Sequence, residues 1–133
     1  MTTKTILVSK LDGAALDWAV AQCEGVDVDI CLDSQRQIET TSCSSCYEPS
    51  KNWAQSGPIM EREGIELSPR YTGYGAIVGW MAMMYNDVRQ ALPMIAQRGD
   101  SLPVAAMRVY VQSKFGSTID VPANFIKHPT QEE

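Results

Sequence analysis

The sequence predicts an α+β fold in which a small mixed or antiparallel sheet packs against two main helices. Two segments carry complete helix signals, at residues 12–24 and 101–115, and short apolar runs between them have the composition of strands. With 133 residues, 44% of them hydrophobic, the chain is long enough to bury a core. We therefore expect a single α+β domain over residues 1–122, followed by a polar C-terminal tail at 123–133.

The first helix is expected after an apolar opening run, KTILVS, which favours a strand ending near Lys10. Asp12 is a typical N-cap residue, and Gly25 can adopt the left-handed conformation that ends a helix. The Ala-rich stretch between them has high helix propensity. Its buried face is expected to consist of Leu16, Ala19, Val20 and Cys23.

The middle of the chain is expected to hold most of the strands. VDVDICL, residues 26–32, alternates apolar and acidic residues and so predicts a strand with one buried face, with RQIETT (36–41) as its partner. IELSP (65–69) predicts a further strand. YGAIVGWMAMMY (74–85) also favours a strand, although so continuous an apolar run is compatible with a buried helix.

Two segments are expected to be largely irregular. Residues 42–58 contain serines, two prolines and a glycine, which favour a loop that is interrupted by Trp53. Pro58 is expected at the first position of one or two helical turns that end at Gly64. Residues 87–100 read as a connection containing Pro93, part of which can be helical.

The last helix has a signal at each end. Ser101 is a suitable N-cap, Pro103 fits the first turn, and Gly116 ends the helix. A short extended segment is expected to follow before the tail. The buried stripe is predicted to be Val104, Met107, Val111 and Phe115.

The charge balance restricts the partners. Eleven Lys and Arg against sixteen Asp and Glu give a formal charge of −5, so non-specific nucleic-acid binding is not expected. A few arginines and backbone N–H groups can still form a local site for a small anion. Because no apolar stretch approaches the length of a membrane span and the start lacks a signal peptide, we expect no membrane partner and a cytoplasmic protein.

Neither a metal nor another cofactor is expected. Cys43 and Cys46 form one CxxC, whereas a zinc ribbon needs a second close pair, and Cys23 and Cys31 are too widely spaced to supply it. A redox-active CxxC normally opens a helix after a strand, and that context is missing here. We expect reduced thiols.

Catalysis is likewise not expected. The single histidine, His128, lies in the polar tail, so a Cys-His or Ser-His arrangement would depend on that segment. Glu61 and Glu63 diverge in a helical turn and do not form a carboxylate pair across one substrate bond. The sequence therefore favours a non-enzymatic protein.

The block NWAQSGPIMER holds the leading candidate ligand residues. Trp53 offers a stacking face, Gln55 an amide, Gly57 an open backbone and Arg62 a guanidinium, which together suit a base or a phosphate. The alternative is structural: Trp53 fills the core, Gly57 shapes a turn, and Arg62 pairs with Glu61 or Glu63 in solvent.

Two further candidates lie on the last helix. Arg108 and Tyr110 are expected to face away from the Met107–Val111 line, toward a pocket or a second subunit. The alternatives are a solvated Arg108 whose stem covers apolar surface, and a Tyr110 at the edge of the core. Met81, Met83 and Met84 are expected to fill the core; if exposed, they indicate a subunit interface.

Three blocks of sequence resemble the NinX-type proteins of lambdoid phages: residues 11–25, 52–67 and 102–122. The resemblance implies a small α+β phage accessory protein expressed in a bacterial host, and it implies no reaction. Phage accessory proteins often counter host defence, and some unrelated ones sequester nucleotide-derived signals. That comparison is one of lifestyle only.

These observations together predict an accessory protein that binds, and possibly sequesters, a small anionic nucleotide-like ligand to counter host defence. Trp53 would stack on a base, Arg62 and Arg108 would hold phosphate, and Gln55 with the Gly57 backbone would orient it, with Tyr110 nearby. The alternative is an inhibitor that binds a host defence or nucleic-acid-processing protein, although the acidic residues form no dense run. A low-activity enzyme is a third hypothesis, and a homo-oligomer is compatible with each.

Overall fold

The computed structural model describes residues 3–32, 38–42, 45–85 and 94–122. These residues form the helices α1 (Gly13–Glu24), α2 (Trp53–Glu63) and α3 (Leu102–Phe115), and a short 3-10 helix, η1 (Val8–Lys10). The strands are β1 (Thr3–Leu7), β2 (Asp29–Leu32), β3 (Ile38–Ser42), β4 (Ser45–Cys46), β5 (Glu66–Tyr71), β6 (Ile77–Tyr85), β7 (Met94–Gly99) and β8 (Thr118–Pro122). The predicted α+β class is confirmed.

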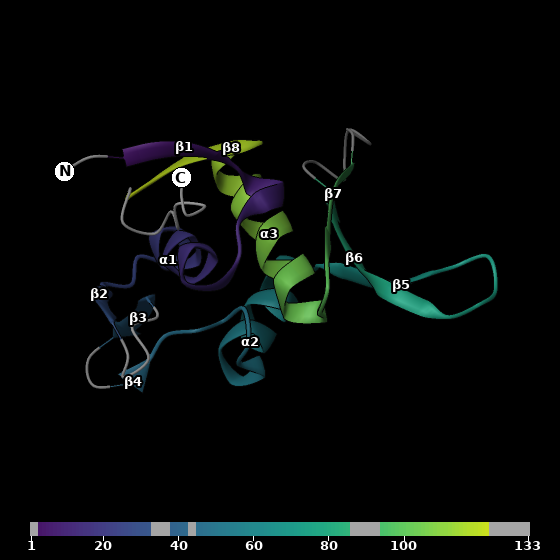
Figure 1. The fold of residues 1–133 in the computed structure, drawn as a ribbon, viewed down its shortest axis with the longest axis horizontal. Coiled ribbons are helices and arrows are strands. Elements are labelled where there is room, and N and C mark those ends of the chain that lie inside the picture. Colours follow the sequence, from purple (N-terminus) through teal and green to yellow (C-terminus); the bar gives the residue numbers. More distant parts are fainter. Residues whose placement is uncertain (1–2, 33–37, 43–44, 86–93, 123–133) are drawn as a thin grey trace, which may run out of the picture.

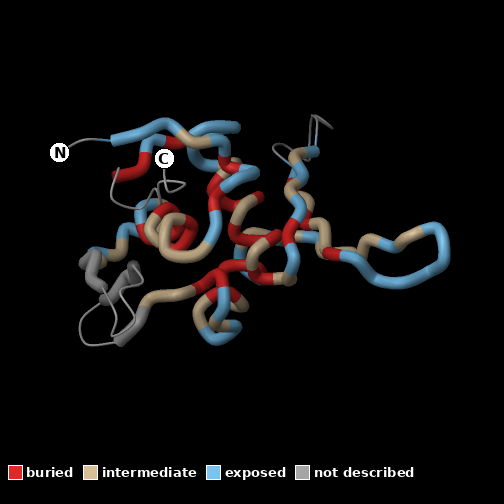
Figure 2. The backbone as a smooth tube through the Cα atoms, viewed as in Figure 1, coloured by how far each residue is buried: buried red, intermediate tan, exposed pale blue. Residues whose placement is uncertain are grey.

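The strands form three small antiparallel sheets, with the orders β1-β8, β2-β3-β4 and β5-β6-β7. Helix α3 runs through the middle of the molecule and packs against the β5-β6-β7 sheet, α1 and α2 (Figure 1). Figure 2 shows the buried backbone concentrated along α3 and the parts of its neighbours that face it. The core is therefore organised around one central helix.

Helix α3 has the two ends that the sequence predicts. The Ser101 hydroxyl accepts a hydrogen bond from the Val104 N–H, and Gly116 ends the helix with a φ of 87°. The predicted buried stripe is too narrow, because neighbours cover the helix on several sides. It also includes one residue wrongly, since Phe115 is 45% exposed. Further buried residues on α3 are Ala105, Ala106, Val109 and Tyr110.

Helix α1 also begins and ends as predicted. The Asp12 carboxylate accepts from the Gly13 N–H at 2.9 Å, and Gly25 ends the helix in the left-handed region. The strand before it is shorter than expected: β1 stops at Leu7, and the chain turns through η1. The Val8 N–H donates to the Ser117 carbonyl at 2.8 Å, so η1 is still attached to the start of β8.

Helix α2 begins five residues earlier than the sequence predicts. The Asn52 side chain accepts from the Ala54 N–H at 2.8 Å and caps a helix that starts at Trp53, within the segment expected to be a loop. Pro58 therefore lies inside the helix, where it lacks the N–H for one intrahelical bond. Burial of Ile59 and Met60 in the core stabilises the helix despite this loss. Gly64 ends it, as predicted.

Strand β7 replaces the connection predicted for part of residues 87–100. It pairs with β6 from Trp80↔Gly99 to Tyr85↔Met94, which also confirms that residues 77–85 form a strand. Gly99 lies so close to α3 that an added Cβ would stand 2.6 Å from the Ala105 nitrogen. The predicted pairing of β2 with β3 and the strand at β5 are confirmed too.

Candidate functional site

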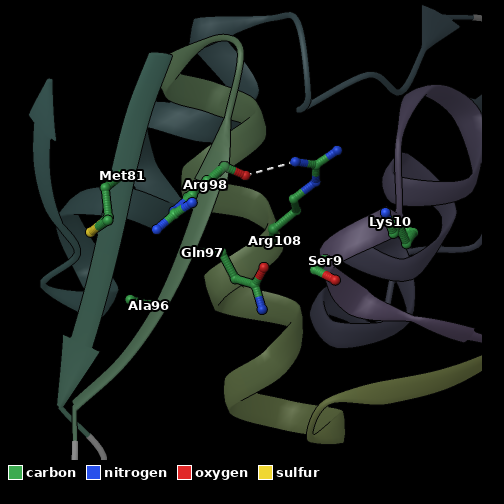
Figure 3. Close-up of a pocket in the computed structure, with 7 residues that line it drawn as sticks. All are labelled: Ser9, Lys10, Met81, Ala96, Gln97, Arg98 and Arg108. Carbon is green, nitrogen blue, oxygen red and sulfur yellow. Dashed lines mark hydrogen bonds between the residues drawn. The ribbon is translucent and has the colours of Figure 1, made fainter. Parts of the chain in front are cut away.

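A cavity of about 500 Å³ lies between the edge of β7, η1 and the middle of α3 (Figure 3). Within the described residues, β7 pairs only with β6, so its other edge is open toward this cavity. The volume lies within the roughly 300–1,000 Å³ range of small-molecule sites. The lining residues are Ser9, Lys10, Met81, Ala96, Gln97, Arg98 and Arg108.

Two backbone carbonyls position the Arg108 side chain in the lining of this cavity. Its Nε donates to the Leu11 carbonyl at 2.8 Å, and its Nη1 donates to the Arg98 carbonyl at 2.6 Å. The guanidinium therefore bridges the segment before α1 and the end of β7. Among the described residues, Nη2 has no protein acceptor, so part of the fork remains available to a ligand.

The described residues that line the cavity carry positive charges and no carboxylate. Lys10 adds a second cation from η1, and none of the seven lining residues is acidic. In the described part of the chain, Lys10 forms no ion pair. Gln97 contributes an amide whose Nε2 already donates to Gln112 at 2.9 Å. Lys10 and Arg108 line one cavity of an acidic protein, and such a site is suited to a small anion.

Arg98 extends the cavity around the edge of β7. Gln97 faces α3, and because side chains alternate along a strand, Arg98 lies on the opposite face. Figure 3 shows its side chain turned away from Arg108 and toward Met81, its register partner on β6. The backbone carbonyl of Arg98 thus positions Arg108, while the guanidinium of Arg98 itself lies on the outer face of the sheet.

A second polar cluster joins α1, α2 and α3. Arg62 donates to Glu24 through Nη1 at 3.1 Å and through Nη2 at 2.5 Å, and its Nε donates to Glu63 at 2.8 Å. The Tyr110 hydroxyl donates to Glu24 and accepts from Arg62 Nη2 at 3.1 Å. The hydrogen bonds from Arg62 lower the pKa of Glu24, and burial raises that of Tyr110.

The sequence offers a position at the edge of the core as one alternative for Tyr110, but the structure buries this residue. It is 1% exposed, because α1 and α2 cover the side of α3 that carries it. Only its hydroxyl reaches the polar cluster, and the Arg62 guanidinium carbon lies 5.7 Å from the ring centroid. These contacts give Arg62 and Tyr110 a structural use, and of the two sequence interpretations of Arg62 they match ion pairing with Glu63.

The other predicted ligand residues lie on α2. Trp53 is 53% exposed, so the alternative that it fills the core does not hold. Gln55 Oε1 accepts from the Glu48 N–H at 2.7 Å, and Gly57 has open space beside it. Trp53, Gln55 and Gly57 are not among the residues that line the cavity. Of the predicted ligand residues, Arg62 and Tyr110 are in contact with each other, and Arg108 alone lies in the cavity lining.

The sequence reasoning does not single out Lys10 or Gln97. Lys10 follows an apolar run and reads as the end of a strand, and Gln97 falls in the segment expected to be a connection. Both residues become candidates only because η1 and β7 meet beside α3. No local motif in the sequence marks that meeting.

Two titratable groups, the buried Asp17 and the half-buried Cys23, serve the fold. The Asp17 carboxylate accepts from the Ser50 N–H at 2.8 Å, and burial raises its pKa to about 6. Burial also raises the pKa of the Cys23 thiol to about 12, which makes it a poor nucleophile. Cys43 and His128 lie outside the described residues. Within those described, no three His, Cys, Asp or Glu side chains gather to hold a metal ion.

Comparison with known families matches residues 7–114 to the family described as Bacteriophage P22, NinX. The chain belongs to this NinX family. The match spans α1, α2, all but the last residue of α3, and every residue that lines the cavity. Membership is consistent with a phage accessory protein.

A search of curated proteins found no match to the NinX chain. Among its described residues, no helix has the length and apolar character needed to cross a membrane.

Proposed function

We propose that this NinX-family protein binds a small, anionic, nucleotide-like molecule in the cavity between β7, η1 and α3, and withholds it from a host defence protein. The observation that carries the proposal is the pair of cations, Lys10 and Arg108, in a cavity of about 500 Å³ whose described lining residues include no Asp or Glu. Among the described lining residues, an anion entering this site meets no carboxylate that would oppose it.

The lining residues suggest separate roles. The free Nη2 of Arg108 and the Lys10 ammonium would hold a phosphate group, because hydrogen bonds between ionised partners are about twice as strong as neutral ones. The Ser9 hydroxyl and the side-chain amide oxygen of Gln97 would orient the sugar or the base. The apolar surfaces of Met81 and Ala96 would cover part of the ligand at the β7 edge.

Arg108 supports a binding role because it is already fixed. Its bonds to the Leu11 and Arg98 carbonyls hold the guanidinium in one position before any ligand arrives. A group that is ordered in advance loses little conformational entropy on binding. Tight, stoichiometric capture of a scarce signal requires this kind of preorganised site.

Native mass spectrometry tests the proposal. The purified protein is incubated with mono-, di- and cyclic nucleotides and ADP-ribose, and any bound compound is identified after denaturation. We expect one compound to bind stoichiometrically and to be released unaltered. An apo mass with every compound would contradict the proposal and favour the protein-binding inhibitor. A released product would favour an enzyme.

Three variants then locate the site. Lys10→Gln is expected to weaken binding roughly 10- to 100-fold, the usual value of a hydrogen bond to a charged group. Lys4→Gln makes the same change on exposed β1 and is expected to bind like the wild type. Loss of binding in Trp53→Ala but not in Lys10→Gln would move the site to α2.

A further inference from the structure

The open edge of β7 presents backbone groups to the cavity, and two carbonyls show which residues face this edge. The Gly99 carbonyl points toward β6, since a Cβ added at Gly79 on that strand would stand 3.2 Å from its oxygen. The Arg98 carbonyl points the other way and accepts from Arg108 Nη1 at 2.6 Å (Figure 3). Successive residues of β7 therefore direct their backbone groups alternately to β6 and to the open edge.

This alternation places the backbone N–H and C=O of Ala96 at the open edge. In an antiparallel ladder, both groups of one residue point to the same side of the strand. Residues 95, 97 and 99 therefore face β6, whereas residues 94, 96 and 98 face the edge. Among the described residues, no strand and no other backbone group pairs with Ala96 at this edge. A donor and an acceptor thus stand side by side there.

Ala96 differs from the other two residues that face the edge. Met94 is not among the residues that line the cavity, and the Arg98 carbonyl is already bonded to Arg108. Ala96 lines the cavity and is exposed, and its methyl group is too small to cover the backbone behind it. Of these three residues, only Ala96 therefore offers both its N–H and its C=O to a ligand in the cavity.

A donor beside an acceptor is the complement of a nucleobase edge. Enzymes that hold a single base bind it through such hydrogen bonds to its Watson–Crick edge. Each common base carries an acceptor next to a donor in one plane, such as N1 and the 6-amino group of adenine, or O4 and N3–H of uracil. A phosphate has only acceptors when it is fully ionised, so it can use the N–H but not the C=O.

The position of Ala96 relative to the cations fits a nucleotide. Ala96 lies two residues before Arg98, about 7 Å along the strand from the carbonyl that holds Arg108. In a nucleotide, the sugar separates the phosphate from the base by a comparable distance. A ligand whose phosphate contacts Arg108 can therefore place its base against the edge of β7.

Met81 supplies an apolar side chain beside this edge. Ala82 and Met84 are buried against the core, so the alternating residues Met81 and Met83 point to the face away from α3. Both are half-buried, so only Met84 follows the expectation that these methionines fill the core. Met81 lines the cavity, and a thioether makes favourable contacts with an aromatic ring.

An extended peptide is the other class of ligand that binds an open strand edge. A peptide strand uses the N–H and the C=O of every second residue along the edge. Here the Arg98 carbonyl is occupied by Arg108, which interrupts that series inside the cavity. A planar base needs only the two groups of Ala96, so the edge favours a base.

We propose that the backbone of Ala96 recognises the base of the bound nucleotide. Its N–H donates to a ring nitrogen or carbonyl oxygen of the base, and its C=O accepts from the neighbouring amino or ring N–H group. This inference rests on the proposed function, in which Lys10 and Arg108 hold the phosphate, and adds the requirement that the ligand carries a base.

Isothermal titration calorimetry tests this requirement with AMP, GMP, CMP, UMP and ribose 5-phosphate, which carries the phosphate without a base. We expect at least one of the nucleotides to bind about tenfold more tightly than ribose 5-phosphate, because two hydrogen bonds are added. Equal affinities would overturn the role of Ala96 while leaving the anion site in place. No binding of any of the five compounds would overturn both proposals.

Ala96→Pro removes the edge-facing N–H, and proline is tolerated where a strand's N–H faces away from the ladder. We expect it to weaken the tightest nucleotide by about tenfold and to leave ribose 5-phosphate unchanged. Ala96→Gly keeps both backbone groups and should bind like the wild type. Far-UV circular dichroism checks that both variants fold. Unchanged nucleotide binding by folded Ala96→Pro would overturn the proposal, as would an equal loss for both ligands.

The amide resonance of Ala96 gives a test in the wild-type protein that depends on no variant. In ¹⁵N-labelled protein, the tightest of the four nucleotides should shift this resonance strongly, because its N–H gains an acceptor. Ribose 5-phosphate should shift it little. Equal shifts with the two ligands, or none with the nucleotide, would overturn the proposal.

Discussion

Arg108 in the middle of α3 donates its Nε–H to the carbonyl of Leu11, 2.8 Å away, and so ties the central helix to the segment between η1 and α1. The same guanidinium bonds the Arg98 carbonyl at the end of β7. One side chain thus connects three of the segments around the cavity, α3, the segment between η1 and α1, and the end of β7. Its structural and its proposed ligand-binding roles must be separated by experiment.

Replacing Arg108 with Lys should reduce both stability and binding. A single ammonium cannot reproduce the fork that reaches both carbonyls, so we expect a loss of roughly 1–3 kcal/mol in the free energy of unfolding. Urea denaturation measures this loss. Lys10→Gln should have the same midpoint of urea denaturation as the wild type. Equal destabilisation by both variants would contradict the claim that Arg108, but not Lys10, stabilises the fold.

Gly99→Ala should destabilise the protein, and Gly57→Ala should not. A Cβ at residue 99 would stand 2.6 Å from the Ala105 nitrogen, whereas one at residue 57 meets no atom within 4 Å. We expect a cost of roughly 1–3 kcal/mol at Gly99. At Gly57, inside α2, we expect little change, because the higher helix propensity of Ala is offset by the restriction that Pro58 places on the residue before it. Thermal denaturation of the pair measures both, and a neutral Gly99→Ala would disprove the close approach of β7 to α3.

Asp17 should make the protein less stable as the pH rises from 4 to 7. Its folded pKa of about 6 exceeds the ordinary value, so the folded state holds the proton more tightly than the unfolded state in this range. The carboxyl's contribution to stability is therefore present at low pH and declines by up to roughly 3 kcal/mol as Asp17 ionises.

Asp17→Asn isolates this effect. The amide oxygen can still accept from the Ser50 N–H but does not titrate, so wild type and variant differ only in the ionisation of this group. Urea denaturation at several pH values should show that the free energy of unfolding of the variant increases relative to that of the wild type as the pH rises. A constant difference between pH 4 and 7 would be inconsistent with the raised pKa.

Tyr110→Phe should weaken the junction of the three helices. The hydroxyl that it removes bonds both Glu24 and Arg62, and we expect a loss of about 1 kcal/mol for a mostly buried hydrogen bond. Tyr74→Phe makes the same change at a fully exposed ring and should leave the unfolding midpoint unchanged. Equal midpoints for both variants would show that the polar cluster adds nothing to stability.

The helix ends with local signals could be predicted from sequence. Asp12, Gly25, Ser101 and Gly116 cap α1 and α3 as expected, because each acts on backbone groups a few residues away. The start of α2 has an equally local signal in Asn52 that the proline at residue 58 obscures. Helix caps are therefore readable even where a breaker follows.

Strand β7 and the candidate site depend on contacts between distant segments. Residues 94–99 become a strand because β6 offers them hydrogen-bonding partners and α3 covers one face, neither of which is visible locally. Lys10 and Arg108 are nearly a hundred residues apart in sequence. The sequence could predict that Arg108 is a candidate ligand residue. Lys10 becomes a second candidate only because η1 packs against α3.

The most direct test is an NMR titration of the ¹⁵N-labelled protein with the nucleotide found by mass spectrometry, recorded as amide shifts. Binding in the proposed cavity predicts the largest changes at Ser9, Lys10, Gln97 and Arg98, with small changes at Trp53, Gln55 and Gly57. The largest changes at the α2 residues, with none around Lys10, would contradict the assignment of the site to the cavity beside β7.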